Sequence, residues 1–146
     1  MVFYDEVRGR LNKMTKIKRK ISLDDVPIDE QLTADEGWVN LRMRWIVTED
    51  VGAKLGTFGY VEFLSGSKHE YHTHPKADEV FFVLSGHGEA RSGDETFEIK
   101  AGDTVFVPIG DVHYFRNTDE KEPLKALFIY LGKPSLEKAG YKLVEP

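Results

Sequence analysis

The amino-acid sequence predicts an all-β protein in which many short antiparallel strands form a sandwich or a barrel. Three observations support this fold class. From Trp38 onward, short runs rich in β-branched and aromatic residues recur. Clusters of glycine, proline, serine, asparagine and aspartate separate these runs, as turns require. The length of 146 residues suffices for one domain with a sizeable core, and no internal repeat is visible.

The N-terminal region differs in composition from the rest of the chain. We expect residues 1–36 to form an arm and an edge strand, and residues 37–146 to form a single barrel domain. A basic cluster runs from Lys13 to Lys20. It is short and lacks an amphipathic partner face, so we expect a solvated arm or the outer rim of an edge strand. Met14 could be an alternative start.

The segment WVNLRMRWIVT, which begins at Trp38, is predicted to be the first strand of the barrel. A period of two places one set of its side chains on a shared apolar face: Val39, Leu41, Met43, Trp45 and Val47. The other face then carries Asn40, Arg42 and Arg44. The apolar face could be barrel interior or the contact of a homodimer, because periodicity does not separate core from interface.

Six further runs are predicted to be strands: TFGYVEFL, DEVFFVLSG, ETFEIK, TVFVP, VHYFRN and LKALFIYLG. The intervening turns are SGS, SGHG, RSGDE, PIGD and NTDEKEP. The run Val80–Leu84 is apolar on both faces, which predicts a strand buried inside a two-sheet fold. Gly86 and Gly88 predict a tight reversal around His87. Only the segments near Leu23–Glu36 and Leu136–Tyr141 are expected to hold a helical turn or two.

Composition excludes several classes of function. A hydrophobic content of 40% argues against disorder, and a formal net charge of −5 offers no broad basic face for nucleic acid. No apolar run approaches the length of a membrane span, and no signal-like start precedes the fold. The chain has no cysteine, which excludes disulfides and thiolate ligands. We therefore expect a cytoplasmic protein that binds neither nucleic acid nor membrane.

Four side chains in two glycine-bounded segments have the spacing of a buried metal site. Residues two apart in a strand share a face, so His72 and His74 project together. Pro75 interrupts the strand, which allows the chain to turn and bring Glu79 beside the pair. His113 comes from a separate strand more than thirty residues later. A site assembled from distant strands is held by the fold rather than by a local loop.

Imidazole nitrogens and a carboxylate oxygen suit one divalent transition metal: iron, manganese, nickel, zinc, cobalt or copper. Four protein ligands would leave an octahedral ion with two open positions, which a catalytic site needs. A lone histidine is more often a surface or core residue than a ligand, and an H-x-H pair alone is weak evidence. The glycines, the proline, Glu79 and the distant His113 at matching offsets favour the metal site.

The two segments resemble the two motifs of the cupin superfamily. The first motif is Gly, five residues, His-x-His, three or four residues, Glu, six residues and Gly; this chain has Gly66, His72, His74, Glu79 and Gly86. The second is Gly, five residues, Pro-x-Gly, two residues, His, three residues and Asn; this chain has Gly102, Pro108, Gly110, His113 and Asn117. Fifteen residues, 87–101, separate them, as in compact single-barrel microbial members.

The resemblance implies a cupin-type double-stranded β-helix, or jelly-roll barrel, with the metal near its open end and minor helical turns near the termini. It implies a metal held by His72, His74, Glu79 and His113. It also implies frequent dimers in which N-terminal strands pack on or exchange with the partner. We therefore expect a homodimer.

Several other residues are candidates around this site. Tyr60, Glu62 and His69 are the nearby groups that could transfer a proton. His69 lies beside Lys68 and Glu70, so a solvated histidine is the expected reading. His87, Asp103 and Asp111 are expected to be turn residues. Arg42 and Arg44 could clamp a carboxylate, although solvent-facing arginines are commoner. Phe81, Val83 and Phe115 share parity with the ligands and are expected to wall an apolar cavity.

Three functions are compatible with such a site, because a fold alone does not determine function. The favoured hypothesis is an Fe(II)-type dioxygenase or other oxidoreductase that orients a small-molecule substrate and excludes bulk water. The second is an isomerase, lyase or decarboxylase acting on a sugar or small hydroxy or keto acid, with the metal as Lewis acid. The third is a binding module without turnover. The sequence does not identify the substrate.

Overall fold

The computed structural model describes residues 17–145, which form one curled antiparallel sheet of nine strands. The strands are β1 (Trp38–Val47), β2 (Gly56–Thr73), β3 (Asp78–Ser85), β4 (His87–Ser92), β5 (Glu95–Lys100), β6 (Thr104–Val107), β7 (His113–Asn117), β8 (Leu124–Leu131) and β9 (Lys142–Leu143). Short helical turns are η1 (Leu23–Asp25), η2 (Ala34–Glu36), η3 (Glu49–Val51) and α2 (Leu136–Ala139). The predicted all-β fold with minor helical turns is confirmed, although η3 lies outside the two segments in which such turns were expected.

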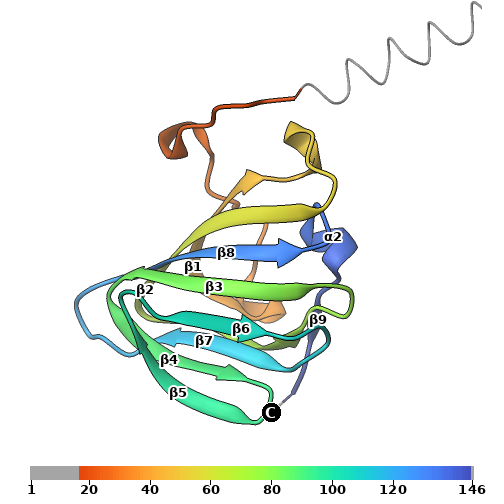
Figure 1. The fold of residues 1–146 in the computed structure, drawn as a ribbon. Helices are drawn as coiled ribbons and strands as arrows, with labels where there is room; N and C mark the ends of the chain where they lie inside the picture. The colour runs from red at the N-terminus through yellow and green to blue at the C-terminus, as the bar shows by residue number, and fades with distance from the viewer. Residues whose placement is uncertain (1–16, 146) are drawn as a thin grey trace, which may run out of the picture.

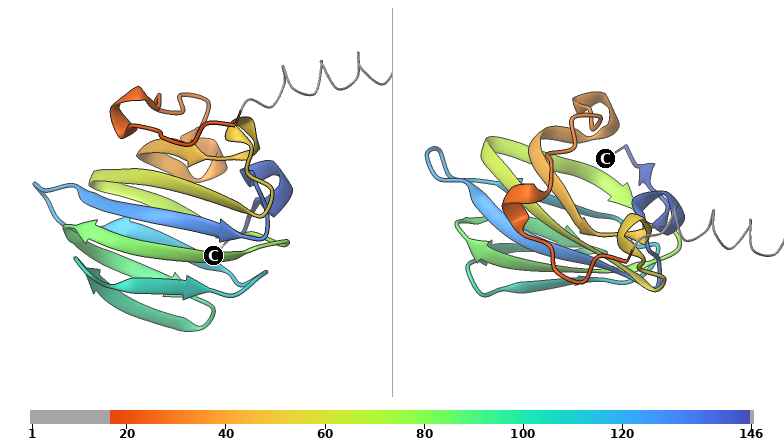
Figure 2. Two further views of the ribbon diagram at one scale, coloured as in Figure 1. Left: turned by 45° about the horizontal axis from the view of Figure 1, so that its top comes forward. Right: turned by 90° about the horizontal axis from the view of Figure 1, so that it is seen from above.

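The strand order explains how the sheet closes into a barrel. The hydrogen-bonded path runs β5-β4-β7-β2-β8-β3-β6, and β1 and β9 both pair with β2. The sheet curls so that its two ends approach each other around an interior (Figures 1 and 2). The hydroxyl of Ser92 on β4, the strand next to one end of the path, donates at 2.7 Å to the carbonyl oxygen of Phe106 on β6, the strand at the other end.

The long strand β2 joins the two halves of the barrel. Its first half pairs with β8, its last residues pair with β7 and β9, and β1 pairs with both parts. The predicted SGS turn is an irregularity within β2. Gly66 there has a φ of +74°, and the pairing with β1 jumps from Val39–Lys68 to Leu41–Phe63. The glycine allows the bulge, so one strand can serve both halves.

The predicted alternation of β1 is wrong at its first residues. Asn40 adopts a φ of +54°, the one positive value outside glycine among the described residues, where the register with β2 shifts. This bulge changes the phase, so that Trp38 is buried in place of Val39. Beyond the bulge, Met43 is buried in the core and Trp45 packs against it. The apolar face of β1 is therefore barrel interior.

Strand β3 is buried on one face only, which corrects the prediction for Val80–Leu84. Glu79, Phe81 and Val83 are buried, whereas Phe82 and Leu84 are 38% and 43% exposed. The apolar outer residues face away from the interior because strand side chains alternate. Apolar content on both faces of a strand therefore did not mean burial on both faces.

Strand β4 was not predicted, because HGEARS lacks the β-branched and aromatic residues on which strand prediction depends. It pairs with both β5 and β7. The reversal before it places Gly86 at a φ of +83°, while Gly88 lies within the strand.

In the N-terminal region, the described residues 17–36 contain η1 and η2 but no strand, so the expected edge strand is not found there. Residues 13–16 of the basic cluster, including Met14, lie outside the described residues.

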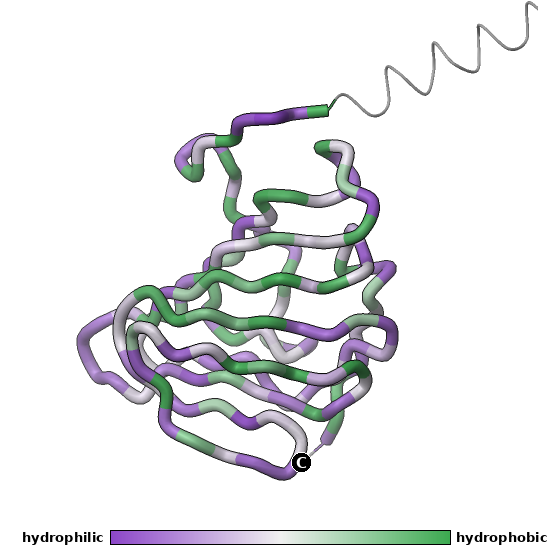
Figure 3. The backbone as a smooth tube through the Cα atoms, in the orientation of Figure 1, coloured by the Kyte–Doolittle hydropathy of each residue, from purple (hydrophilic) through white to green (hydrophobic). Residues whose placement is uncertain are grey.

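The core occupies the interior of the barrel. Phe81 and Phe115 stack with ring centroids 3.8 Å apart, and Phe63 meets Phe81 edge-on. Along the chain, hydrophobic residues concentrate in the strands and hydrophilic residues in many of the connections (Figure 3). Within residues 17–145, no helix has the length and apolar character that crossing a bilayer requires.

Candidate metal centre

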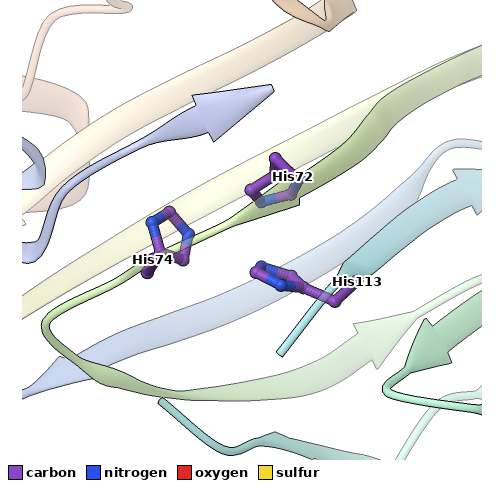
Figure 4. Close-up of side chains that lie close together, drawn as sticks. All are labelled: His72, His74 and His113. Atoms are coloured by element: carbon purple, nitrogen blue, oxygen red, sulfur yellow. The ribbon is translucent and has the colours of Figure 1, made fainter. Parts of the chain in front are cut away.

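Three histidines meet inside the barrel. His72 lies near the end of β2, His74 follows that strand, and His113 begins β7 directly opposite His72 in the sheet register. Each histidine offers one ring nitrogen, and these nitrogens lie within 4.8 Å of one another. Figure 4 shows the three rings turned toward a common point. All three side chains are buried, so the sequence prediction that they come together holds in the structure.

Each of these imidazoles is held by a hydrogen bond on the ring side away from the cluster. Nδ1 of His72 lies 2.5 Å from the carbonyl oxygen of Glu70, and Nδ1 of His113 lies 2.9 Å from that of Asp111. Nδ1 of His74 lies 2.7 Å from the carbonyl oxygen of Gly140. A carbonyl oxygen only accepts, so each Nδ1 must carry the proton and donate it.

The remaining ring nitrogens fit a metal ion. Once Nδ1 carries the proton, Nε2 of a neutral imidazole is a lone-pair donor. Nε2 of His72, His74 and His113 and Oε2 of Glu79 are buried without a hydrogen-bond partner within the described chain. Buried polar atoms are rarely left unpaired, and such hydrogen bonds to the outer nitrogen are typical of metal-ligating histidines. The three histidines could therefore hold a metal.

Glu79 from β3 lies beside two of the three histidines. Its carboxylate oxygens are 3.6 Å from Nε2 of His74 and 3.4 Å from Nε2 of His113. Burial alone would raise the pKa of Glu79, but the neighbouring His113 and His74 outweigh burial and hold this pKa below its usual value, which favours the ionised carboxylate. Both separations are long for hydrogen bonds. A shared cation accounts better for the convergence.

His69 is part of the site, which corrects the expectation of a solvated histidine. The residue is 5% exposed, and its ring stacks on that of His72 with centroids 3.6 Å apart. On its other side it stacks on Trp38 at 3.8 Å. The expectation failed because β2 continues through this segment and its register with β7 shifts between His69 and His72. The shift lets two residues three apart both face inward. Burial holds the pKa of His69, like that of His72, well below its usual value.

The structure does not bring the other two proton-transfer candidates to the histidines. Tyr60 pairs across the sheet with Leu127, while its neighbour Val61 faces the core, so Tyr60 and Glu62 lie on the outer face of β2. There the Tyr60 hydroxyl donates to Oε1 of Glu62 at 2.9 Å. The carboxylate clamp is not formed either: Arg42 is exposed, and Arg44 donates to the Leu23 carbonyl at 3.1 Å.

Sequence reasoning missed three aromatic residues at the site. Tyr130 on β8 is 1% exposed, and its ring centroid lies 4.5 Å from that of His74. Tyr141 and Trp38 stack on each other beside His69, with centroids 5.0 Å apart. Tyr130 shares parity with Phe128 and Ala126 in the predicted strand, so its inward direction was available from the sequence. Trp38 depends on the β1 bulge, and Tyr141 belongs to no motif.

A small cavity adjoins the cluster in the barrel interior. Its volume is about 10 Å³, roughly the space that one water molecule needs. Most of its wall is apolar or aromatic, with three polar groups, from Met43, Val61, Phe63, His69, Glu79, Phe81, Phe115, Phe128 and Tyr130. The predicted walls Phe81 and Phe115 are among them. No lysine or arginine of the described chain lines this cavity, so an anionic ligand would find no side-chain cation there.

Comparison with known proteins assigns the family. The cupin domain model matches residues 59–130, which contain all four predicted ligands. The chain belongs to the cupin superfamily. Its fold agrees: a polyketide cyclase from Streptomyces resistomycificus superposes with a TM-score of 0.72 at 18% identity, covering 89% of this chain and 87% of that one. The jelly-roll prediction is thus confirmed.

Two sequence relatives place this cupin among diverse proteins. A protein of Aquifex aeolicus is 43% identical over 67 residues, covering 44% of this chain and 55% of that protein. A wheat (Triticum aestivum) oxalate oxidase is 27% identical over 100 residues, covering 63% of this chain and 43% of that enzyme. The cupin chain spans about half the length of the first curated relatives that it matches. Its distant relatives therefore include enzymes.

Proposed function

We propose that this cupin is a metal-dependent enzyme acting on a small molecule, with His72, His74, Glu79 and His113 holding one divalent transition metal. The proposal rests on the hydrogen bonding of the three histidines: in each ring Nδ1 is hydrogen-bonded to a carbonyl oxygen, while Nε2 is buried without a hydrogen-bond partner among the described residues. Bound there, a metal would supply Lewis-acid or redox chemistry.

The chain's own residues would balance the charge of the metal, exclude bulk water from the site and donate a hydrogen bond there. The ionised carboxylate of Glu79 supplies the negative charge that a buried divalent cation needs. The aromatic wall excludes bulk water, which strengthens electrostatic interactions at the centre. Burial, with Glu79 nearby, raises the pKa of Tyr130 well above its usual value, so this residue is a neutral phenol that can donate a hydrogen bond.

An oxidoreductase, in particular an Fe(II)-type dioxygenase, is the activity that we favour. A redox-neutral isomerase, lyase or decarboxylase requires a residue that transfers a proton beside the metal. Tyr60 and Glu62 lie on the outer face of β2, which removes two of the three residues considered for that step. The oxalate oxidase among the relatives also supports oxidative chemistry.

Redox-neutral chemistry is the alternative, since His69 and Tyr130 both line the cavity and could transfer protons. The small volume of that cavity, about 10 Å³, would also suit a module that binds metal or a small ligand without turnover. The enzyme proposal requires the wall of the site to move when a substrate enters.

Elemental analysis of anaerobically purified protein, followed by oxygen uptake with a panel of chelating small molecules, tests the proposal. Because the four ligands would hold one ion, we expect about one iron per chain. We also expect oxygen uptake that depends on substrate and that His113→Ala abolishes. Product formation without oxygen uptake would favour the redox-neutral alternative. Stoichiometric metal without turnover of any compound would favour the binding module. Protein that takes up no transition metal would contradict both enzyme proposals and the metal-binding form of the module.

We further propose a cytoplasmic homodimer. The absence of cysteine supports the location. The apolar face of β1 packs in the interior of the single chain, so we place the proposed contact on the outer face of the sheet instead. There Phe58, Ile129, Val80 and Phe106 follow one another across β2, β8, β3 and β6. Such a contiguous apolar face suits association with a second copy, because a two-fold axis places one patch on itself.

A further inference from the structure

The C-terminal segment Gly140–Val144, here called the strap, lies against the proposed metal centre. We propose that the strap is a working part of that centre: the carbonyl group of Gly140 orients His74, so docking of the strap determines how tightly the metal is held. This inference rests on the proposed function, because it concerns a ligand of the same metal.

The strap is attached along the end of β2 that carries the histidines. In β9, Leu143 pairs with His72 and Lys142 pairs with Thr73. The backbone N–H of Val144 donates to the carbonyl oxygen of Tyr71 at 2.8 Å. In the close-up of the site, this strand is the blue-violet arrow beside His72 and His74 (Figure 4). The attachment is short, so few backbone hydrogen bonds hold it.

His74 depends on the strap in a way that the other two histidines do not. The carbonyl acceptors of His72 and His113 belong to Glu70 and Asp111, each two residues earlier in the same chain segment. These hydrogen bonds form wherever the local strand forms. The acceptor of His74 is Gly140, which is 66 residues away in sequence. Only the orientation of His74 therefore requires a distant segment to dock.

The position of the strap depends on two residues. Gly140 lets the backbone pass close to Pro75: its φ is +83°, and a Cβ atom at this residue would lie 2.8 Å from Cδ of the rigid proline ring. Tyr141 next to it donates its hydroxyl to the Glu36 carbonyl oxygen at 2.5 Å and lies 3.3 Å from Nε2 of His69. A side chain at position 140 would therefore move the carbonyl group away from His74 while the rest of the barrel stays in place.

The test compares Gly140→Ala with Gly132→Ala in the full-length, metal-free protein. Gly132 also has a positive φ, of +88°, but a Cβ atom there meets nothing within 4 Å, so its variant places a side chain at a positive φ without displacing a neighbour. Zinc affinity is measured by competition with a chromophoric chelator. We expect Gly140→Ala to lower this affinity by about 10- to 100-fold, the usual effect of losing a hydrogen bond to a ligating histidine. Gly132→Ala should leave it unchanged.

A second readout does not depend on metal. Long-range ¹H–¹⁵N NMR reports which ring nitrogen of each histidine carries the proton. We expect Gly140→Ala to change the tautomer of His74 alone, while His72 and His113 keep the proton on Nδ1. A purely structural role for the strap would lower the melting temperature without this selective change. Tyr141→Ala, which removes the anchor but keeps the glycine, should shift affinity and tautomer in the same direction and serves if the alanine at 140 prevents folding.

The outcomes separate this inference from the proposed function. Unchanged affinity and an unchanged His74 tautomer in Gly140→Ala and Tyr141→Ala would overturn the role of the strap. An equal loss of affinity in Gly132→Ala would overturn it too, because strain alone would then suffice. Failure of the unaltered protein to bind zinc would instead contradict the metal centre itself.

Discussion

At His72, His74 and His113, backbone carbonyl groups decide which ring nitrogen carries the proton. This matters because an imidazole with a free tautomer presents an N–H to the cluster part of the time, and an N–H cannot bind a metal. Three Nδ1 contacts of 2.5–2.9 Å remove that freedom. The metal site is therefore prepared by hydrogen bonds that lie outside it.

The ligand assignment predicts that His113→Ala loses stoichiometric metal while the barrel stays folded. Zinc stabilises the unaltered protein by mass action, about 2.7 kcal/mol at a hundred times the dissociation constant, and the variant should lose that gain. Differential scanning calorimetry with and without zinc measures it. His87→Ala is the matched control, since His87 is exposed and pairs with Asp119 at 2.9 Å. A zinc-induced shift of normal size in His113→Ala would contradict the assignment.

The buried histidines also predict a pH dependence of stability. Burial lowers the pKa of His69 and His72 in the folded protein, while the unfolded chain has values near roughly 6.5. Below that pH the unfolded state binds more protons, so the metal-free protein should lose stability between pH 7.5 and 5.5 in urea titrations. Replacing His69 with Phe should make this slope shallower. An identical slope would show that His69 does not contribute.

Residue identities at the site were predictable to different degrees. Period two places His72 and His74 on one face, and the turn at Pro75 allows Glu79 to lie beside them, whereas the placement of His113 with these three rested on the resemblance to the cupin motifs. His69 was not predictable as a buried residue, because its inward direction depends on a shift in register. Tyr141 reaches the site through tertiary docking, which no local pattern records.

At the scale of single elements, bulges decide which residues face the interior. Asn40 is the residue whose backbone reverses the phase of β1 and brings Trp38 inward. Asparagine tolerates the left-handed region, whereas a β-branched residue there is strained. We expect Asn40→Val to destabilise the protein by about 1–2 kcal/mol and Asn40→Gly to change stability little. Urea unfolding measures both. Equal stability of the two variants would show that backbone strain at this position is unimportant.

Strand prediction failed where composition and position disagree. β4 consists mainly of small and polar residues, and it lies between its two partners β5 and β7. Backbone hydrogen bonds to these partners hold it in the sheet, and its own sequence does not predict them. β3 presents the opposite case, with large apolar side chains on an exposed face. Both errors arise because strand formation and burial depend on neighbours across the sheet.

At the scale of the whole molecule, the outer apolar face predicts self-association. Phe106 is 53% exposed on β6, at the end of the apolar row across the outer face. A lysine at this position should convert the expected dimer into a monomer, because a buried unpaired charge is costly. Light scattering coupled to size-exclusion chromatography measures the mass. Leu55→Lys is the control, since Leu55 is 78% exposed outside the strands. A monomeric unaltered protein would refute the dimer.

The barrel architecture was predictable from the motifs and turns, whereas its closure was not. Two complete motifs imply the jelly roll, and the alternating strands agree with it. The union of both halves through β2, and the attachment of the strap, depend on contacts between residues far apart in sequence. Local patterns carry no information about these contacts.

The pairing of β2 with four other strands has a consequence for how the protein opens. Its interior amide groups cannot reach solvent until several neighbours separate, so their hydrogen exchange should require near-global unfolding. The two-residue β9 can detach on its own, and its amides should exchange much faster. Loss of metal from this protein would then occur by two routes on different timescales: frequent fraying at the C-terminus and rare collapse of the whole barrel.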